Sequence, residues 1–193
     1  MKTYHITLVA LFAALMAIGA NITTIAPFLQ VGGVPLSMQP FFCILAGLLL
    51  GRRLGALSMI VYALIGIAGA PVFAQFEGGI QAIFGQTGGF ILSFIFAAYI
   101  SGLIVEKAKQ IKLSVFLLAS FVSIVLIYII GTTYMFFALN LWLGANVSYL
   151  AAWGIMTWFM IKDIVFTVAC ALLASRIYHA MPKNLPIQKK KSA

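Results

Sequence analysis

The hydrophobic pattern of this chain consists of long apolar stretches separated by short polar or glycine-rich segments. A helix that crosses a membrane needs about 20 apolar residues, with a range of about 17–25. We therefore expect six helices, close to residues 5–25, 36–50, 54–70, 87–105, 113–139 and 149–178. The pattern predicts an all-α membrane protein, a six-transmembrane-helix bundle in which residues 1–193 form a single integral membrane domain.

The composition supports lipid as the solvent of this chain. Apolar residues make up 64% of the sequence and charged residues only 8%, whereas a soluble domain carries about 25% charged residues. The net charge of +9 does not indicate nucleic-acid binding, because the basic residues are divided among short loops and form no continuous face. Attraction to anionic membrane lipid explains the charge better.

The positions of the basic residues predict an orientation. Eleven of the twelve lie between or beyond the apolar stretches in alternate gaps: Lys2, Arg52, Arg53, Lys107, Lys109, Lys112, Arg176, Lys183, Lys189, Lys190 and Lys191. Because cytoplasmic loops collect Lys and Arg, we expect both termini in the cytoplasm. The first apolar run is then a retained span and not a cleaved signal.

The three segments predicted outside contain no Lys or Arg and one acid, Glu77. They cover about residues 27–36, 70–89 and 140–148 and are rich in glycine and apolar residues. Irregular backbone at membrane depth is tolerated where it is buried in protein or lines a cavity. We expect these loops to cap a cavity; the alternative is interfacial segments that bind nothing.

Lys162 and Asp163 are the ionisable pair inside an apolar stretch. Asp163 lies twelve residues beyond Ala151, roughly 18 Å along a helix, near the bilayer midplane, where an ionised Asp costs about 2.5–3.5 kcal/mol. Such residues mark a ligand site; the alternatives are an ion pair that holds the helices together and a Lys that snorkels to the interface. Neighbouring helix positions point in different directions, so we expect the two side chains not to face each other directly but to line two walls of one cavity.

Two further segments offer polar groups to a ligand. The Gln39 amide, near the outer end of the second predicted helix, is both donor and acceptor. The run Gly85-Gln86-Thr87-Gly88-Gly89 opens the fourth predicted helix, where free N–H groups suit a carboxylate. An interfacial Gln and a simple glycine turn are the alternatives.

Small residues form a stripe on the first predicted helix: Ala10, Ala13, Ala14 and Ala17. Spacings of four allow close helix–helix approach in lipid. The contact is either internal or with another subunit.

Several chemistries are missing from the sequence. The two histidines, His5 and His179, lie at predicted cytoplasmic ends, which argues against an intramembrane Ser–His dyad. No cluster has metal-ligand spacing, and three acids in total leave no paired-carboxylate site. We expect no enzyme activity, no metal and no cofactor.

Four motifs occur in order along the chain: Val34-Pro35-Leu36-Ser37-Met38-Gln39, Leu45-Ala46-Gly47-Leu48-Leu49-Leu50-Gly51-Arg52-Arg53-Leu54-Gly55-Ala56, Gly66-Ile67-Ala68-Gly69-Ala70-Pro71-Val72-Phe73 and Gln86-Thr87-Gly88-Gly89-Phe90. With them the chain resembles the BioY biotin transporter family over essentially its whole length. Members are substrate-binding S components of energy-coupling factor (ECF) transporters. The resemblance implies an S-component fold in a bacterial cell membrane, biotin as substrate, and partnership with a coupling (T) subunit and two ATPase subunits. The small-residue stripe would face the T subunit.

The resemblance also implies roles at a biotin site. Asp163 would accept ureido N–H groups, and Gln39 would serve the ureido carbonyl or the tail. Lys162 or the backbone amides of Gly88 and Gly89 would hold the carboxylate, with Gln86 beside them. The apolar walls would come from three residues: Phe90, Trp158 and Val34.

The sequence departs from the family pattern at one position of the last helix. Many members carry Asp followed three residues later by Lys, but the later position here is Phe166. The partner of Asp163 and the residue that holds the tail are therefore open. An S component for another vitamin and an autonomous carrier or channel for a small solute are the alternative functions.

Overall fold

The structure is a computed structural model that describes residues 3–22, 30–31, 34–35 and 37–180. In chain order, its elements are α1 (Thr3–Asn21), β1 (Gln30–Val31), β2 (Val34–Pro35), α2 (Gln39–Leu50), α3 (Arg52–Ile67), the 3-10 turn η2 (Ala74–Phe76), α4 (Gln81–Phe84), α5 (Gly88–Lys107), α6 (Leu113–Leu141) and α7 (Tyr149–Ala180). The two short strands pair antiparallel, Gln30 with Pro35 and Val31 with Val34. Within the described ranges, each of the six predicted helices has a counterpart of twelve or more residues.

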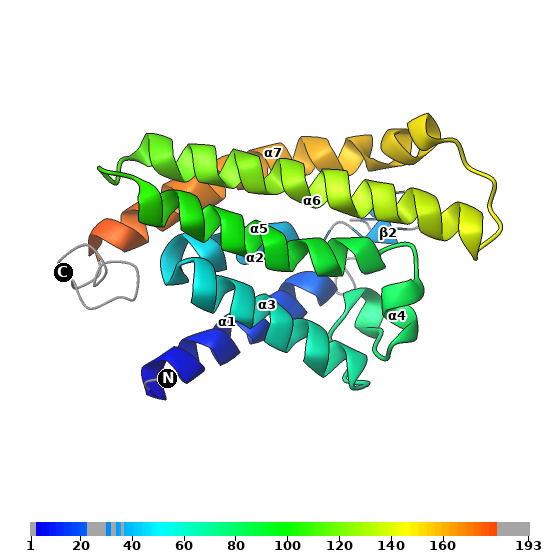
Figure 1. Ribbon diagram of the computed structural model, residues 1–193, viewed down its shortest axis with the longest axis horizontal. Coiled ribbons are helices and arrows are strands. Elements are labelled where there is room, and N and C mark those ends of the chain that lie inside the picture. Colours follow the sequence, from blue (N-terminus) through cyan, green and yellow to red (C-terminus); the bar gives the residue numbers. More distant parts are fainter. Residues whose placement is uncertain (1–2, 23–29, 32–33, 36, 181–193) are drawn as a thin grey trace.

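The helices pack around α2 and α5. Helix α5 contacts α2, α3 and α6, while α7 lies along α6 and α2, and α1 lies against α3 and α2 (Figure 1). Helix α2 is the most enclosed, because nearly all its residues are buried. A helix that is apolar on every side belongs in such a central position.

Glycines permit the close approach of α2, α3 and α5. A Cβ on Gly47 would lie 2.3 Å from the carbonyl oxygen of Ala98, and one on Gly102 would lie 2.2 Å from the backbone nitrogen of Arg52. Only a residue without a side chain fits against backbone at these distances. Dispersion contacts between backbones then replace the hydrophobic driving force that lipid does not provide.

The prediction that Arg52-Arg53 lie in a loop between two helices was wrong. Gly51, with φ of 83°, turns the chain by itself, so α3 begins at Arg52. The backbone N–H of Arg52 donates to Oε1 of Glu106 at 3.0 Å. This bond satisfies one of the free donors at the start of α3.

Helix α3 also ends earlier than predicted, at Ile67, because Gly69 adopts φ of 102°. The next segment was expected to be irregular as far as residue 89 but contains η2 and α4. Phe73 is 2% exposed and lies where a Cβ on Gly66 would be, 2.1 Å from its ring. The segment folds back onto the bundle, as expected, and Phe73 is its anchor.

Within the described residues, four helices are long and apolar enough to cross a membrane: α1, α5, α6 and α7. Helices α2 and α3, with 12 and 16 residues, reach about 18 and 24 Å at 1.5 Å per residue. A hydrocarbon core is about 30 Å thick. Helices α2 and α3 are therefore shorter than the hydrocarbon core. The segment that contains η2 and α4 follows α3 and lies at one end of the bundle.

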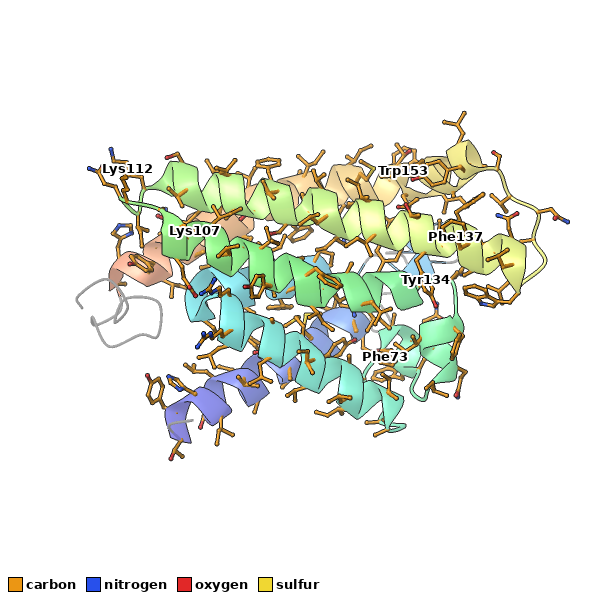
Figure 2. All side chains as sticks on the ribbon, viewed as in Figure 1. Phe73, Lys107, Lys112, Tyr134, Phe137 and Trp153 are labelled. Carbon is orange, nitrogen blue, oxygen red and sulfur yellow. The ribbon has the colours of Figure 1, made fainter. Side chains whose placement is uncertain are left out.

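The two ends of the bundle differ in the residues they carry. Lys107 and Lys112 lie at the end where α1 begins and α7 ends, whereas Phe73, Tyr134 and Trp153 lie toward the other (Figure 2). We call the first the basic end and the second the aromatic end.

Candidate ligand-binding site

A cavity lies between α2, α5, α6 and α7 and is closed on one side by the segment between α3 and α5. The centre of a water molecule can reach about 100 Å³ of it, whereas about 10–15 Å³ on this measure holds one water. The space therefore suits a small organic molecule. Its polar lining is Ser37, Gln39, Glu77, Gln86, Thr87, Tyr128, Lys162 and Asp163; its apolar lining is Pro40, Phe73, Ala74, Ala82, Phe90, Ile91, Phe94, Ile127, Met135, Met156 and Phe159.

Lys162 and Asp163 form an ion pair at this cavity, with 2.8 Å between Nζ and Oδ1. The expectation that they would not face each other directly was wrong. The four-carbon Lys stem bends back across the helix surface, so the ammonium reaches a neighbour that the backbone directions separate. Nζ also donates to the carbonyl oxygen of Ser37. An ammonium has three N–H donors, and these two contacts, counted among the described residues, use two of them.

Tyr128 of α6 completes the surroundings of the carboxylate. Its hydroxyl donates to Oδ2 of Asp163 at 2.7 Å, so each carboxylate oxygen has one partner among the described residues. Asp163 is 5% exposed, and a buried charge is tolerated when it is paired and hydrogen-bonded. Each oxygen retains a lone pair that can accept from a ligand. Sequence reasoning missed Tyr128, since nothing distinguishes it from the other aromatic residues of α6.

Gln39 contributes the second polar wall, and a hydrogen bond to Tyr62 holds its side chain in place. Its Nε2 donates to the hydroxyl oxygen of Tyr62 at 2.8 Å, and this hydroxyl donates to the carbonyl oxygen of Val72 at 3.1 Å. Tyr62 is 1% exposed and packs edge-on against Phe73, with 5.5 Å between ring centroids. The start of α2 is thus connected through α3 to the segment that closes the cavity.

The apolar walls come from α5, α6 and α7, with further residues from α2 and the segment between α3 and α5. Phe90 packs edge-on against Tyr128, with 6.3 Å between ring centroids, and its ring occupies the space beside Gly131. Phe159, one turn before Asp163, is 7% exposed. These rings place apolar surface next to the ion pair, and polar contacts are stronger where the local dielectric is low.

Some of the predicted residues do not meet at this site. Trp158 is 63% exposed and lies outside the cavity, which Phe159 lines instead. Gly88 donates its N–H to the carbonyl oxygen of Gly85, and Gly89 packs against Tyr134. Gln86 and Phe90 do line the cavity. Val34 belongs to β2, and its side chain falls outside the described part.

Phe166 and Lys162 are four positions apart in α7, so they lie on the same face of the helix, one turn from each other. The ammonium nitrogen of Lys162 is 5.8 Å from the centroid of the Phe166 ring. A cation over an aromatic face at this distance is attracted to it. The Lys162 ammonium therefore reaches the neighbourhood of position 166.

The small-residue stripe on α1 divides between two surfaces. Ala13 is buried, Ala17 is half-buried, and Ala10 and Ala14 are exposed. Ala13 therefore packs inside the bundle, while Ala10 and Ala14 leave a shallow outward strip. Among the described residues, no three His, Cys, Asp or Glu side chains gather as metal ligands would.

The chain matches the sequence profile of the BioY family over residues 1–183. A Bacillus subtilis (strain 168) protein provisionally named biotin transporter BioYB is 54% identical, covering 95% of this chain and 92% of its own. A Pyrococcus horikoshii protein named a probable biotin transporter BioY is 39% identical over 92% of this chain and 98% of its own.

A solved structure supports the fold. It is described as the S-component for biotin from an ECF-type ABC transporter, and it superposes with a TM-score of 0.71 over 96% of both chains, at 19% identity. The apolar helices found in the described part of the chain and the match to a transporter family indicate a multi-pass membrane protein. From the extent of the profile match and the identity to these relatives, the chain belongs to the BioY family.

Proposed function

We propose that this protein is the biotin-binding S component of an ECF transporter, which captures biotin outside the cell and delivers it inward with a T subunit and two ATPase subunits. The cavity carries this proposal. It combines a buried carboxylate, an ammonium and aromatic walls in one place, within a family whose relatives are named biotin transporters. Biotin offers the complement: a ureido ring, a thioether ring and a carboxylate tail.

The ureido ring fits the charged wall. Asp163 has a free lone pair on each oxygen and accepts a ureido N–H, a charge-assisted bond that is roughly twice as strong as a neutral one. The remaining N–H of Lys162 donates to the ureido oxygen. In this arrangement the ion pair is retained when biotin binds, and Lys162 takes the part that Phe166 cannot.

The apolar part of biotin then lies against Phe90 and Phe159, and the tail extends to the mouth of the cavity. Gln86 is exposed and lines that mouth. Its side-chain amide has N–H groups that can donate to the carboxylate of the tail. Glu77 also lines the cavity, and its charge favours a tail that points away from it.

The orientation follows from the basic end. We propose six crossings by one integral membrane domain, with both termini in the cytoplasm, because Lys107 and Lys112 lie at the end where α1 begins and α7 ends. The cavity is at the aromatic end and so opens outside. The exposed strip at Ala10 and Ala14 is then available to the T subunit. Replacing Ala14 with Leu should reduce uptake in the complete transporter while biotin binding by the isolated protein is unchanged.

Binding of radiolabelled biotin to the purified protein tests the proposal. We expect submicromolar affinity, competition by unlabelled biotin, and none by thiamin or riboflavin. Competition by another vitamin would reassign the substrate, and uptake into liposomes by the lone protein would indicate an autonomous carrier. Asp163→Asn should weaken binding about tenfold or more, with the exposed Lys107→Gln as a control.

A further inference from the structure

The buried hydroxyl group of Tyr62 has one proton and two hydrogen-bond partners. It accepts from Nε2 of Gln39 at 2.8 Å and donates to the carbonyl oxygen of Val72 at 3.1 Å. A carbonyl can only accept, so the Tyr62 proton belongs to Val72. The hydroxyl oxygen is therefore an acceptor toward Gln39, and Gln39 must turn its NH₂ group to Tyr62.

This assignment decides which atom of Gln39 a ligand meets. Gln39 lines the cavity, and its NH₂ group is held by Tyr62. Within the described residues, its Oε1 has no hydrogen-bond partner, and it is not one of the polar atoms that are fully buried without a partner. Oε1 is therefore accessible. The amide could have presented a donor or an acceptor, but the bond to Tyr62 leaves the acceptor.

We infer that Tyr62 is a positioning residue that makes the cavity specific for ligands with two N–H donors flanking a carbonyl. The acceptors are Oε1 of Gln39 and the carboxylate of Asp163, and the donor is Lys162. Lys162 is itself bonded to the carbonyl of Ser37, two residues before Gln39, so the donor lies beside the start of α2. A cyclic urea presents the matching order of N–H, C=O and N–H.

Tyr62 acts only through Gln39, because it does not line the cavity itself. Its position is secured independently of the ligand by Phe73. A fixed acceptor rejects a ligand that lacks the N–H, since a polar group is then left buried without a partner. A freely turning amide would reject it less, because it could offer its donor instead. The inference rests on the proposed function for the identity of the ligand.

A double-mutant cycle tests it on the full chain. The variants are Tyr62→Phe, Gln39→Met and the two combined. The ligands are biotin and its two derivatives that carry a methyl group on one or the other ureido nitrogen. We expect the unaltered protein to prefer biotin over the derivative methylated on the Gln39 side by about a hundredfold. Each single variant should lower that preference to about tenfold or less, and the double variant should match Gln39→Met, because Tyr62 has nothing left to orient.

The control is Tyr134→Phe. Its hydroxyl likewise donates to a backbone carbonyl, that of Ile83 at 2.7 Å, but it does not line the cavity and should leave the preference unchanged. Equal weakening of all three ligands by Tyr62→Phe, or additive effects in the double variant, would overturn the inference. If Tyr62→Phe fails to fold, an unchanged preference in Gln39→Met overturns it alone. Absence of biotin binding by the unaltered protein would instead remove the proposed function.

Discussion

At the basic end of the bundle, α2, α3 and α5 meet through glycines, whereas at the aromatic end α2 and α5 join α6 and α7 around a cavity. Each end has an ion pair. Arg52 and Glu106, 3.3 Å apart, have side chains that are 27% and 13% exposed. Those of Lys162 and Asp163 are 16% and 6% exposed, at 2.8 Å. The Arg52–Glu106 pair thus lies where helices pack against one another, whereas the Lys162–Asp163 pair lines the cavity.

The comparison shows when an ion pair indicates function. A pair in contact with solvent contributes about 0–1 kcal/mol and needs no further role. A pair within the membrane is costly to desolvate, and loss of one partner costs about 3–5 kcal/mol. In this chain the pair that is costly to break is the one that lines the cavity.

Lys162→Met should have the largest effect. It leaves Asp163 buried with Tyr128 as its remaining partner, so we expect a loss of about 3 kcal/mol or more in the free energy of unfolding and about a hundredfold weaker biotin binding. Thermal unfolding in detergent and equilibrium binding measure the two. Adding Asp163→Asn should restore much of the stability but not the affinity; restored affinity would show that the pair is purely structural.

Tyr128→Phe removes one hydrogen bond from the carboxylate. Bonds to charged groups contribute about 1.5–3 kcal/mol, so we expect a loss within that range in stability and about tenfold in affinity. Tyr134→Phe, which breaks a bond to a neutral carbonyl, is the matched control and should cost less. Equal losses in the two variants would argue that Asp163 is not ionised.

Gly102→Ala tests the helix packing at the basic end. The new Cβ would lie 2.2 Å from the nitrogen of Arg52, so backbone must shift, at about 1–3 kcal/mol. Biotin affinity of the folded protein should not change, since Gly102 is at the other end from the cavity. Gly154→Ala is the control, because a Cβ there meets nothing within 4 Å. A large loss of affinity in Gly102→Ala would mean that the two ends are coupled.

Arg52→Gln should have the smallest effect. Its side-chain pair with Glu106 is partly solvated, and the backbone bond of residue 52 to that carboxylate is retained. We expect a change of less than about 1 kcal/mol in stability and none in affinity. A destabilisation close to that of Lys162→Met would erase the distinction between the two pairs.

Prediction from the sequence succeeded best where a property belongs to each residue by itself. The six helical segments follow from hydropathy, and Asp163 was singled out because any ionisable group inside an apolar stretch is costly. Helix ends were less accurate. Gly51 and Gly69 turn the chain through positive φ, and many glycines in the same sequence do not.

Contacts between distant residues could not be predicted in this way. Tyr128 and Asp163 are separated by 35 positions, and Gln39 and Tyr62 by 23. Neither bond has a local signature, since Tyr and Gln are compatible with many environments. The Lys162–Asp163 pair was misjudged for a different reason: helix periodicity describes Cβ directions, but a long side chain reaches across them.

The sequence by itself determined that the chain lies in a membrane, which of its segments are helical and where a costly charge is buried. These properties sum over residues, because transfer from water to lipid depends on each side chain separately. Only the tertiary structure decided which groups surround Asp163, which atom of Gln39 is bound to Tyr62 and that Trp158 lies outside the cavity. Hydrogen bonds and packing depend on atoms a few ångströms apart, and only the folded chain brings those atoms together.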